Sequence, residues 1–259
     1  MIMKKLHDLK RTIIMGILNI TPDSFSDGGS LISENDIEKR VSEMISDGAD
    51  IIDIGGQSTR PGYCEVSLED EIARIKPALE ICKKYDTIIS IDTYFPAVAE
   101  YSLKSGAHII NDVRGIDNPD MLPVIKKYGC GYVIMHDKKG SPEKIANRLE
   151  SAAKAAESFG ISHDNIILDG GIGFGKDNTE NLVLINNYDK ISQLGYITLV
   201  GASRKRIIGA SCNTPNPRER VFGTVAAHVI AINRGANIIR VHDILAAKQS
   251  AMTADAILR

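Results

Sequence analysis

The sequence has no tryptophan, and phenylalanine and tyrosine bring the aromatic share to only 5% of its 259 residues. Proteins that bind single-stranded nucleic acids stack the bases on aromatic side chains, and this chain offers few of them. Charge of one sign is also scarce, because the formal net charge is −2 and lysine and arginine form no long block. Both deficits argue against a nucleic-acid partner.

Cysteine is rare and scattered. The four cysteines, Cys64, Cys82, Cys130 and Cys212, form no Cys-x-x-Cys pair and have no nearby histidine to complete a zinc site. A chain of this length with isolated cysteines is typical of a reducing compartment, where thiols stay reduced. The sequence therefore predicts free thiols and a cytoplasmic protein.

Long hydrophobic runs are missing as well. No stretch approaches the roughly 20 apolar residues that cross a bilayer, and residues 1–11 are charged and lack the apolar region of a signal peptide. We therefore expect no membrane partner. What is present is the composition of an ordinary globular domain, 43% hydrophobic and 25% charged, in a chain long enough to bury a large core.

Short apolar runs rich in β-branched residues alternate with segments of helical periodicity along the whole chain. The runs predict strands over residues 12–20, 51–54, 88–91, 109–110, 132–135, 166–168, 197–200 and 238–241. The periodic segments predict helices over residues 36–46, 68–84, 96–105, 119–128, 142–159, 179–194, 217–234 and 246–258. Several of these begin at a proline or a capping residue and end at a glycine.

Two folds fit eight strand–helix units, a doubly wound open sheet and a closed barrel. Strands that are apolar throughout favour parallel strands covered on both faces. An open sheet gathers its ligand groups at one switch point, whereas a barrel brings every strand end to one mouth. Polar residues lie at or just past the carboxyl end of every predicted strand: Asn19, Asp53, Asp92, Asn111, His136, Asp169, Ser203 and His242. We therefore predict an α/β fold, a (β/α)8 TIM barrel, with residues 1–259 as a single domain.

The first strand ends in an unusual way. An apolar run stops at Thr21-Pro22, and a loop rich in hydroxyl and carboxylate groups follows as far as Gly29. The amide of Asn19 lies at the strand end, beside this loop. A simple turn needs none of these polar groups, so the segment indicates a ligand-binding loop.

An ordered set of motifs resembles the dihydropteroate synthase family, the pterin-binding barrels of folate biosynthesis. The motifs occur in the family's order, close to successive strand ends. They are residues 15–29 (MGILNITPDSFSDGG), 53–62 (DIGGQSTRPG), 90–93 (SIDT), 111–112 (ND), 135–136 (MH), 169–176 (DGGIGFGK), 203–205 (SRK) and 240–243 (RVHD). The resemblance spans the chain from its first strand to its last.

The resemblance implies a transferase that condenses 6-hydroxymethyl-7,8-dihydropterin pyrophosphate with p-aminobenzoate, a reaction that sulfonamides target. It also implies a homodimer formed on the later helices, whose faces are rich in alanine. Two alternatives stay open: a noncatalytic pterin-binding paralogue, and a methyltetrahydrofolate:corrinoid methyltransferase, which shares the barrel.

The resemblance also implies the roles of individual residues. A pterin edge is read by buried carboxylates and amides, which accept from ring N–H groups or supply a donor beside them. The implied pterin-binding residues are Asp92, Asn111, Asp169, Lys205 and Arg240. The implied p-aminobenzoate and pyrophosphate residues are Thr59, Arg60, Pro61, Phe174, Ser203 and His242. Asp92, Lys205, Arg240 and His242 are the implied catalytic residues, and Asn19 is the implied ligand of a Mg²⁺ cofactor.

Two motifs depart from the family's pattern. Gln57 stands where the family usually has glutamate, and the family's Asp-Pro-Gly is here Asp169-Gly170-Gly171. Residues 171–175 lack the spacing of a dinucleotide fingerprint. The basic run 204–206 follows the seventh strand directly, where barrels often hold phosphate, so we expect it to face an anion.

Overall fold

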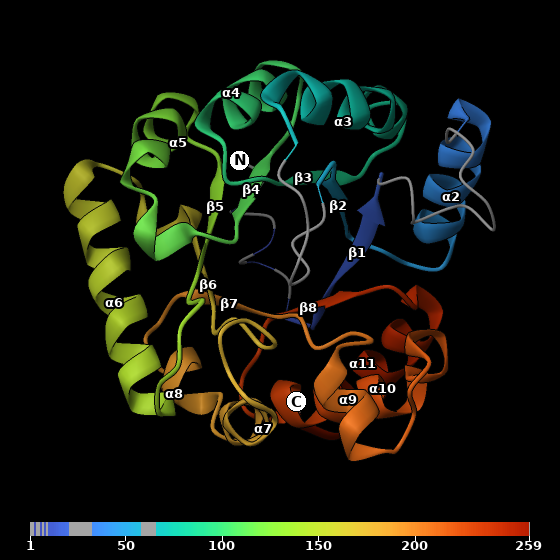
Figure 1. The fold of residues 1–259 in the computed structure, drawn as a ribbon, viewed down its shortest axis with the longest axis vertical. Helices are drawn as coiled ribbons and strands as arrows, with labels where there is room; N and C mark the ends of the chain where they lie inside the picture. Colours follow the sequence, from blue (N-terminus) through green and yellow to red (C-terminus); the bar gives the residue numbers. More distant parts are fainter. Residues whose placement is uncertain are drawn as a thin grey trace.

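The strands of the computed structural model close into a barrel encircled by helices (Figure 1). The structure describes residues 3, 6, 8, 10–20, 33–57 and 66–258. Its strands are β1 Ile13–Asn19, β2 Ile51–Gly55, β3 Ile88–Asp92, β4 Ile109–Asp112, β5 Gly131–Met135, β6 Ile166–Asp169, β7 Ile197–Val200 and β8 Ile238–Val241. Each strand runs parallel to the next, and β8 pairs with β1. The predicted barrel of eight parallel strands is confirmed.

Residues along each strand alternate between two hydrophobic cores, as the period of two in a strand requires. Ile13 and Met15 of β1 belong to a cluster that collects residues from the strands and fills the barrel interior, together with Ile51, Ile109 and Ile238. The residues between them belong to a larger cluster, which lies between the strands and the surrounding helices. A barrel of this size is packed inside, so ligands bind at its rim.

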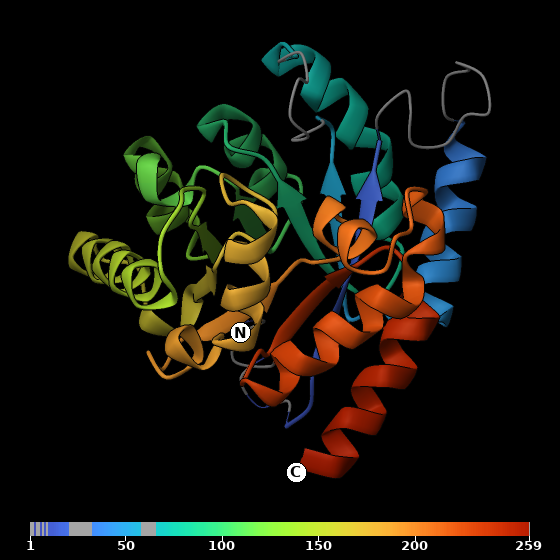
Figure 2. The same ribbon diagram turned by 60° about the horizontal axis from the view of Figure 1, so that its bottom comes forward.

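The helices lie on the outside of the barrel, and Figure 2 shows α10 and α11 side by side on one flank. The α-helices are α2 Glu34–Ser46, α3 Leu68–Cys82, α4 Pro96–Lys104, α5 Leu122–Tyr128, α6 Pro142–Phe159, α7 Asn178–Asn186, α8 Asp189–Ser192, α9 Arg206–Ser211, α10 Val221–Asn233 and α11 Ile244–Leu258. Short 3-10 helices are η1 Gly115–Asp117, η2 Pro119–Met121, η3 His163–Asn165 and η4 Pro217–Glu219. Among the described residues, no helix combines the length and apolarity needed to cross a membrane.

The caps of the helices explain most of their predicted boundaries. Side chains of Ser33, Ser67, Ser141 and Asp177 accept a hydrogen bond from the backbone of the first helical turn in α2, α3, α6 and α7. Such caps satisfy amide groups that have no partner inside the helix. The left-handed Gly160, with φ of 105°, ends α6 where glycine was expected to end it.

Four helical segments differ from the predictions. The predicted helices 119–128 and 217–234 each begin with a short 3-10 helix, η2 and η4, ahead of α5 and α10. The segment 179–194, predicted as one helix, is divided into α7 and α8 at Asn187 and Tyr188. The Asn187 side chain donates to the carbonyl of Val183 at 2.8 Å, a local bond typical of asparagine at helix ends. The helix α9, six residues long, was not predicted, because so short a segment carries little helical periodicity.

Candidate active site

Polar side chains from separate strands meet at the carboxyl-terminal rim of the barrel. Strand pairing places Gly55, Asp92 and Asn111 side by side, because Gly55 pairs with Asp92 and Asp92 pairs with Asn111. Asp169 ends β6, and Arg240 is the next-to-last residue of β8. The rim thus collects charged and amide groups that are far apart in the sequence.

The guanidinium of Arg240 links two buried carboxylates. Its Nε donates to Oδ2 of Asp53 at 2.6 Å, and its Nη2 donates to Oδ2 of Asp92 at 2.7 Å. Asp53 is fully buried and Asp92 is 7% exposed. Because water scarcely reaches these carboxylates, their charges depend on Arg240 for compensation. The structure therefore brings the predicted residues Asp92 and Arg240 into one ion-pair network.

Asp53, which has no predicted role at the site, also belongs to this network. Besides Arg240, its Oδ2 accepts a hydrogen bond from Nδ2 of Asn111 at 3.0 Å. Asp53 therefore orients two predicted pterin-binding residues, Asn111 on β4 and Arg240 on β8. Asp53 lies in the middle of β2 and is the first residue of the motif 53–62, and that motif was a signal that could have found it.

The electrostatics of this network leave acceptors available to a ligand. Burial raises the pKa of Asp92 to about 7, although Arg240 opposes the shift. Among the described residues, Oδ1 of Asp92 and Oδ1 of Asp53 are buried without a hydrogen-bond partner. Buried polar atoms are nearly always paired in native proteins, so these two oxygens are acceptors that the described residues leave unused.

Asp169 presents a second buried carboxylate at the rim. The amide of Gly171 donates to its Oδ1 at 2.7 Å, and burial raises the pKa of Asp169, with the charge of Lys205 opposing the shift. The side chain is 7% exposed. Asp169 thus has the burial and the fixed orientation that the recognition of a donor edge requires.

Lys205 connects the loops that follow β6 and β7. Its ammonium donates to the carbonyl of Ile172 and lies 4.5 Å from the centre of the Phe174 ring. Burial lowers the pKa of Lys205 to about 8, while the negative charge of Asp169 raises it. Lys205 and Phe174, predicted to bind different parts of the substrates, are therefore neighbours in one wall of the site.

A buried ammonium holds the β6–α7 loop together. Nζ of Lys176 donates to the carbonyls of His136, Gly171 and Phe174 at 3.0, 3.1 and 3.2 Å. Gly171 has φ of 68°, and a Cβ there would lie 2.0 Å from the carbonyl oxygen of His136. The glycines of this motif therefore allow close approach to β5, and they do not form a dinucleotide site.

Ser203 and His242 are also brought together by the barrel. Oγ of Ser203 lies 3.0 Å from Nδ1 of His242 and accepts from the backbone amide of His242 at 3.1 Å. Ser203, predicted for p-aminobenzoate, and His242, predicted for pyrophosphate, lie after β7 and β8 and thus form one unit.

The basic run 204–206 does not act as one anion-facing patch. The guanidinium of Arg204 donates twice to the carboxylate of Asp243, so its charge is already paired. Arg206 is exposed and begins α9. The prediction for this run is therefore wrong for Arg204, while Lys205 faces the site.

Asn19 is the last residue of β1 and is half-buried. Its Oδ1 would lie 3.1 Å from a Cβ added to Gly55, so the glycine leaves room for the amide at the rim. In the described part of the chain, no three histidine, cysteine or acidic side chains gather into a metal site. Mg²⁺ needs no such cage, because it is commonly held by one or two protein oxygens together with substrate phosphates and water. The donor set therefore fits Mg²⁺ bound jointly with a phosphorylated substrate.

Three predicted residues, Thr59, Arg60 and Pro61, lie outside the described residues, as does the loop 21–29. Their roles stay predictions.

Comparison with known proteins identifies the family. A family model described as "Pterin binding enzyme" matches residues 15–242. A relative from Clostridium beijerinckii named dihydropteroate synthase is 47% identical over 261 residues, which cover 96% of each chain. This chain belongs to the dihydropteroate synthase family.

Crystal structures of dihydropteroate synthases share the barrel. One from Clostridium difficile, solved in the presence of pteroic acid, has a TM-score of 0.90 at 41% identity and covers 96% of this chain and 98% of that chain. One from Yersinia pestis, solved with a sulfonamide drug complex, has a TM-score of 0.89 at 38% identity, covering 96% and 95%. The likeness therefore extends over the whole of the described barrel.

Proposed function

We propose that this protein acts as a dihydropteroate synthase, joining 6-hydroxymethyl-7,8-dihydropterin pyrophosphate to p-aminobenzoate and releasing pyrophosphate. One observation carries the proposal: the Asp53–Arg240–Asp92 network, Asp169 and Lys205 occupy the same barrel rim. Such a rim could perform several reactions, and membership of the dihydropteroate synthase family identifies this one.

The buried groups match the donors and acceptors of a pterin ring. Asp169 offers a carboxylate to the ring N–H and amino group, and Asn111 offers an amide to the remaining ring nitrogens. Lys205 supplies a donor for the ring carbonyl. The planar guanidinium of Arg240, fixed by two carboxylates, is suited to lie against the ring face. The site therefore holds the pterin edge and face by groups that are already oriented.

The chemical step is a displacement at the methylene carbon of the pterin substrate. The C–O bond breaks, pyrophosphate leaves with the electron pair, and positive charge spreads into the pterin ring. The aniline nitrogen then forms the C–N bond and releases a proton. We assign to Asp92 the stabilisation of the developing cation, so catalysis in this proposal is electrostatic and positional, without a covalent enzyme intermediate.

The leaving group and the second substrate are assigned to the outer part of the rim. His242, held by Ser203, supplies a donor to phosphate oxygens. Phe174 and Lys205 form a wall against which an aromatic carboxylate can lie. Asn19 is the residue that would hold Mg²⁺, which neutralises the pyrophosphate when bound. Thr59, Arg60 and Pro61 are proposed to complete this part of the site.

A pyrophosphate-release assay with both substrates and Mg²⁺ tests the proposal. We expect pyrophosphate and 7,8-dihydropteroate in equal amounts, and Asp92→Asn should abolish both. Binding of the pterin without any product would indicate the noncatalytic paralogue. Methyl transfer to a corrinoid protein, without condensation, would indicate the methyltransferase.

The dependence of turnover on pH follows from two buried groups. Burial raises the pKa of Asp92 to about 7 and lowers the pKa of Lys205 to about 8. The ionised forms of both groups are the active ones, so kcat/KM should fall as pH drops below 7 and as it rises above 8. Measurement of kcat/KM between pH 5 and pH 10 checks this bell shape.

Lys176 requires a control, because burial lowers its pKa to about 8 as well. In Lys205→Arg the guanidinium stays charged, so the alkaline limb should move to higher pH even if the maximum is lower. If the alkaline limb of the kcat/KM profile stays at the same pH in this variant, a group other than Lys205 causes the loss of activity above pH 8.

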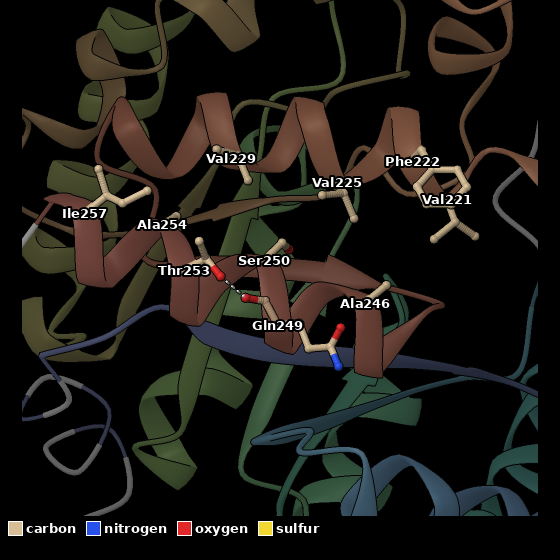
Figure 3. A pocket seen from close by; sticks show the side chains of 10 residues that line it. All are labelled: Val221, Phe222, Val225, Val229, Ala246, Gln249, Ser250, Thr253, Ala254 and Ile257. Carbon is tan, nitrogen blue, oxygen red and sulfur yellow. Dashed lines mark hydrogen bonds between the residues drawn. The ribbon is translucent and has the colours of Figure 1, made fainter.

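We also infer that two copies of the chain associate through α10 and α11. Between these helices lies an apolar surface groove, whose lining Figure 3 displays: Val221, Phe222, Val225, Val229, Ala246, Gln249, Ser250, Thr253, Ala254 and Ile257. Phe222 is 88% exposed and Ile257 is 77% exposed. Exposed apolar patches of this kind mark interaction sites. The groove carries no charged side chain, so a second copy with twofold symmetry fits it.

Most of the alanines expected at this interface pack inward. Ala227, Ala231, Ala247, Ala251 and Ala254 are buried within the protomer and belong to the core around the barrel, although Ala254 also lines the groove, and Ala226 is exposed. Large apolar side chains therefore form most of the proposed dimer surface, and the buried alanines pack the two helices onto the strands.

Glutamate at the groove should separate the dimer. We expect the wild-type chain to have twice its 28.2 kDa mass in light scattering at micromolar concentration, and Phe222→Glu with Ile257→Glu to give monomers. Phe159→Glu, at an exposed site on α6, is the matched control and should stay dimeric. A monomeric wild-type chain would rule out the dimer.

Cytoplasmic localisation is proposed on the state of the cysteines. Cys82 and Cys130 are buried free thiols and Cys212 is an exposed one. Free thiols of this kind are typical of a reducing compartment.

A further inference from the structure

The hydroxyl of Tyr188 lies between the ends of β6 and β7. It accepts a hydrogen bond from the amide of Gly170 at 3.1 Å and donates one to the carbonyl of Leu199 at 2.5 Å. The ring is fully buried at the break between α7 and α8. The Tyr188 hydroxyl therefore links the ends of β6 and β7, although Tyr188 lies in neither strand.

This bridge begins where the pairing of the two strands ends. Asp169 and Leu199 form the last pair between β6 and β7. On the other side of β6, the amide of His136 donates to the carbonyl of Asp169 at 3.0 Å. On the side of β5, a backbone hydrogen bond thus holds Asp169. On the side of β7, the hydroxyl of Tyr188 holds the neighbouring backbone.

The bridge depends on a backbone N–H at position 170, which Gly170 provides. Proline, which the family usually carries there, has no N–H and could not donate to the hydroxyl. The space is also limited, since a Cβ on Gly170 would lie 2.9 Å from Cδ1 of Ile191 and 3.1 Å from Cε2 of Tyr188. The departure of the Asp-Gly-Gly motif and the buried tyrosine therefore form one structural unit.

We infer that Tyr188 is a positioning residue for the pterin-binding carboxylate of Asp169. It fixes the backbone next to Asp169 in place of the rigidity that a proline would give. Burial raises the pKa of Tyr188 well above its ordinary value, so the O–H remains a donor throughout the working range of pH. The inference rests on the proposed function, in which Asp169 reads the pterin edge.

Tyr188→Phe tests the inference, because it removes the hydroxyl and keeps the ring. We expect calorimetry to give weaker binding of a pterin analogue, by at most about fivefold, because the full worth of one ordinary hydrogen bond sets the upper limit for an internal bond, while the KM for p-aminobenzoate stays unchanged. The matched control is Tyr196→Phe, which removes a hydroxyl bonded to Glu157 at 3.1 Å ahead of β7, and it should bind the analogue like the wild type.

A second variant separates positioning from simple packing. Gly170→Pro removes the donor to Tyr188, so adding Tyr188→Phe to it should weaken pterin binding no further. Additive losses in the double variant would overturn the inference, as would a Tyr188→Phe variant that melts earlier but binds the analogue normally. If the wild-type chain itself fails to bind the analogue, the proposed function is overturned together with the inference. If only the variants behave differently from expectation, the inference alone is overturned.

Discussion

Replacing Arg240 by alanine is expected to abolish turnover and to lower the free energy of unfolding by about 3–5 kcal/mol. The change leaves Asp53 and Asp92 buried without their shared cation, whose Nε and Nη2 now lie 2.6 and 2.7 Å from them. Breaking a buried ion pair on one side is destabilising because the remaining charge keeps its desolvation penalty. Chemical denaturation and the pyrophosphate-release assay measure the two effects.

The double variant Arg240→Met with Asp53→Asn is the control for this prediction. It removes the cation together with one carboxylate, so stability should recover part of the loss while turnover stays absent. Unfolding of Arg240→Ala at the same denaturant concentration as the wild type would show that Arg240 does not compensate the charges of Asp53 and Asp92.

The barrel could be predicted from the sequence because its signals are local. Each strand has its own apolar run, and each strand end has its own polar residue. The long segment 179–194 was predicted as one helix because its apolar spacing continues across Asn187. The break is set by tertiary contacts, since Tyr188 turns inward to bond Gly170 and Leu199.

The residues of the candidate site could be predicted from motifs, but not the partners that hold them. Asp53 and Arg240 are 187 positions apart, and no local pattern relates them. The same reason explains the basic run 204–206, where the sequence shows three adjacent charges but not that Asp243 pairs with the first. Motifs thus identify the groups, and the fold decides which of them face the ligand.

The substitution Asp169→Asn should weaken pterin binding at least tenfold. The amide places a donor where the carboxylate accepted from the ligand's N–H groups. An unpaired buried polar group costs about 1–3 kcal/mol, and more where charge is involved. Since Asp169 is 7% exposed, water cannot easily replace the lost acceptor.

The control for this variant is Asp50→Asn, which makes the same chemical change at the other end of the barrel. Asp50 precedes β2 and pairs with Arg11. Its substitution is expected to affect stability and to leave pterin binding unchanged.

The most direct measurement is a calorimetric titration of a pterin analogue into the wild-type chain, Asp169→Asn and Asp50→Asn at one pH. Our account predicts equal binding by the wild type and Asp50→Asn, with at least tenfold weaker binding by a folded Asp169→Asn. Binding of the analogue to Asp169→Asn with wild-type affinity would contradict the assignment of the barrel rim as the pterin site.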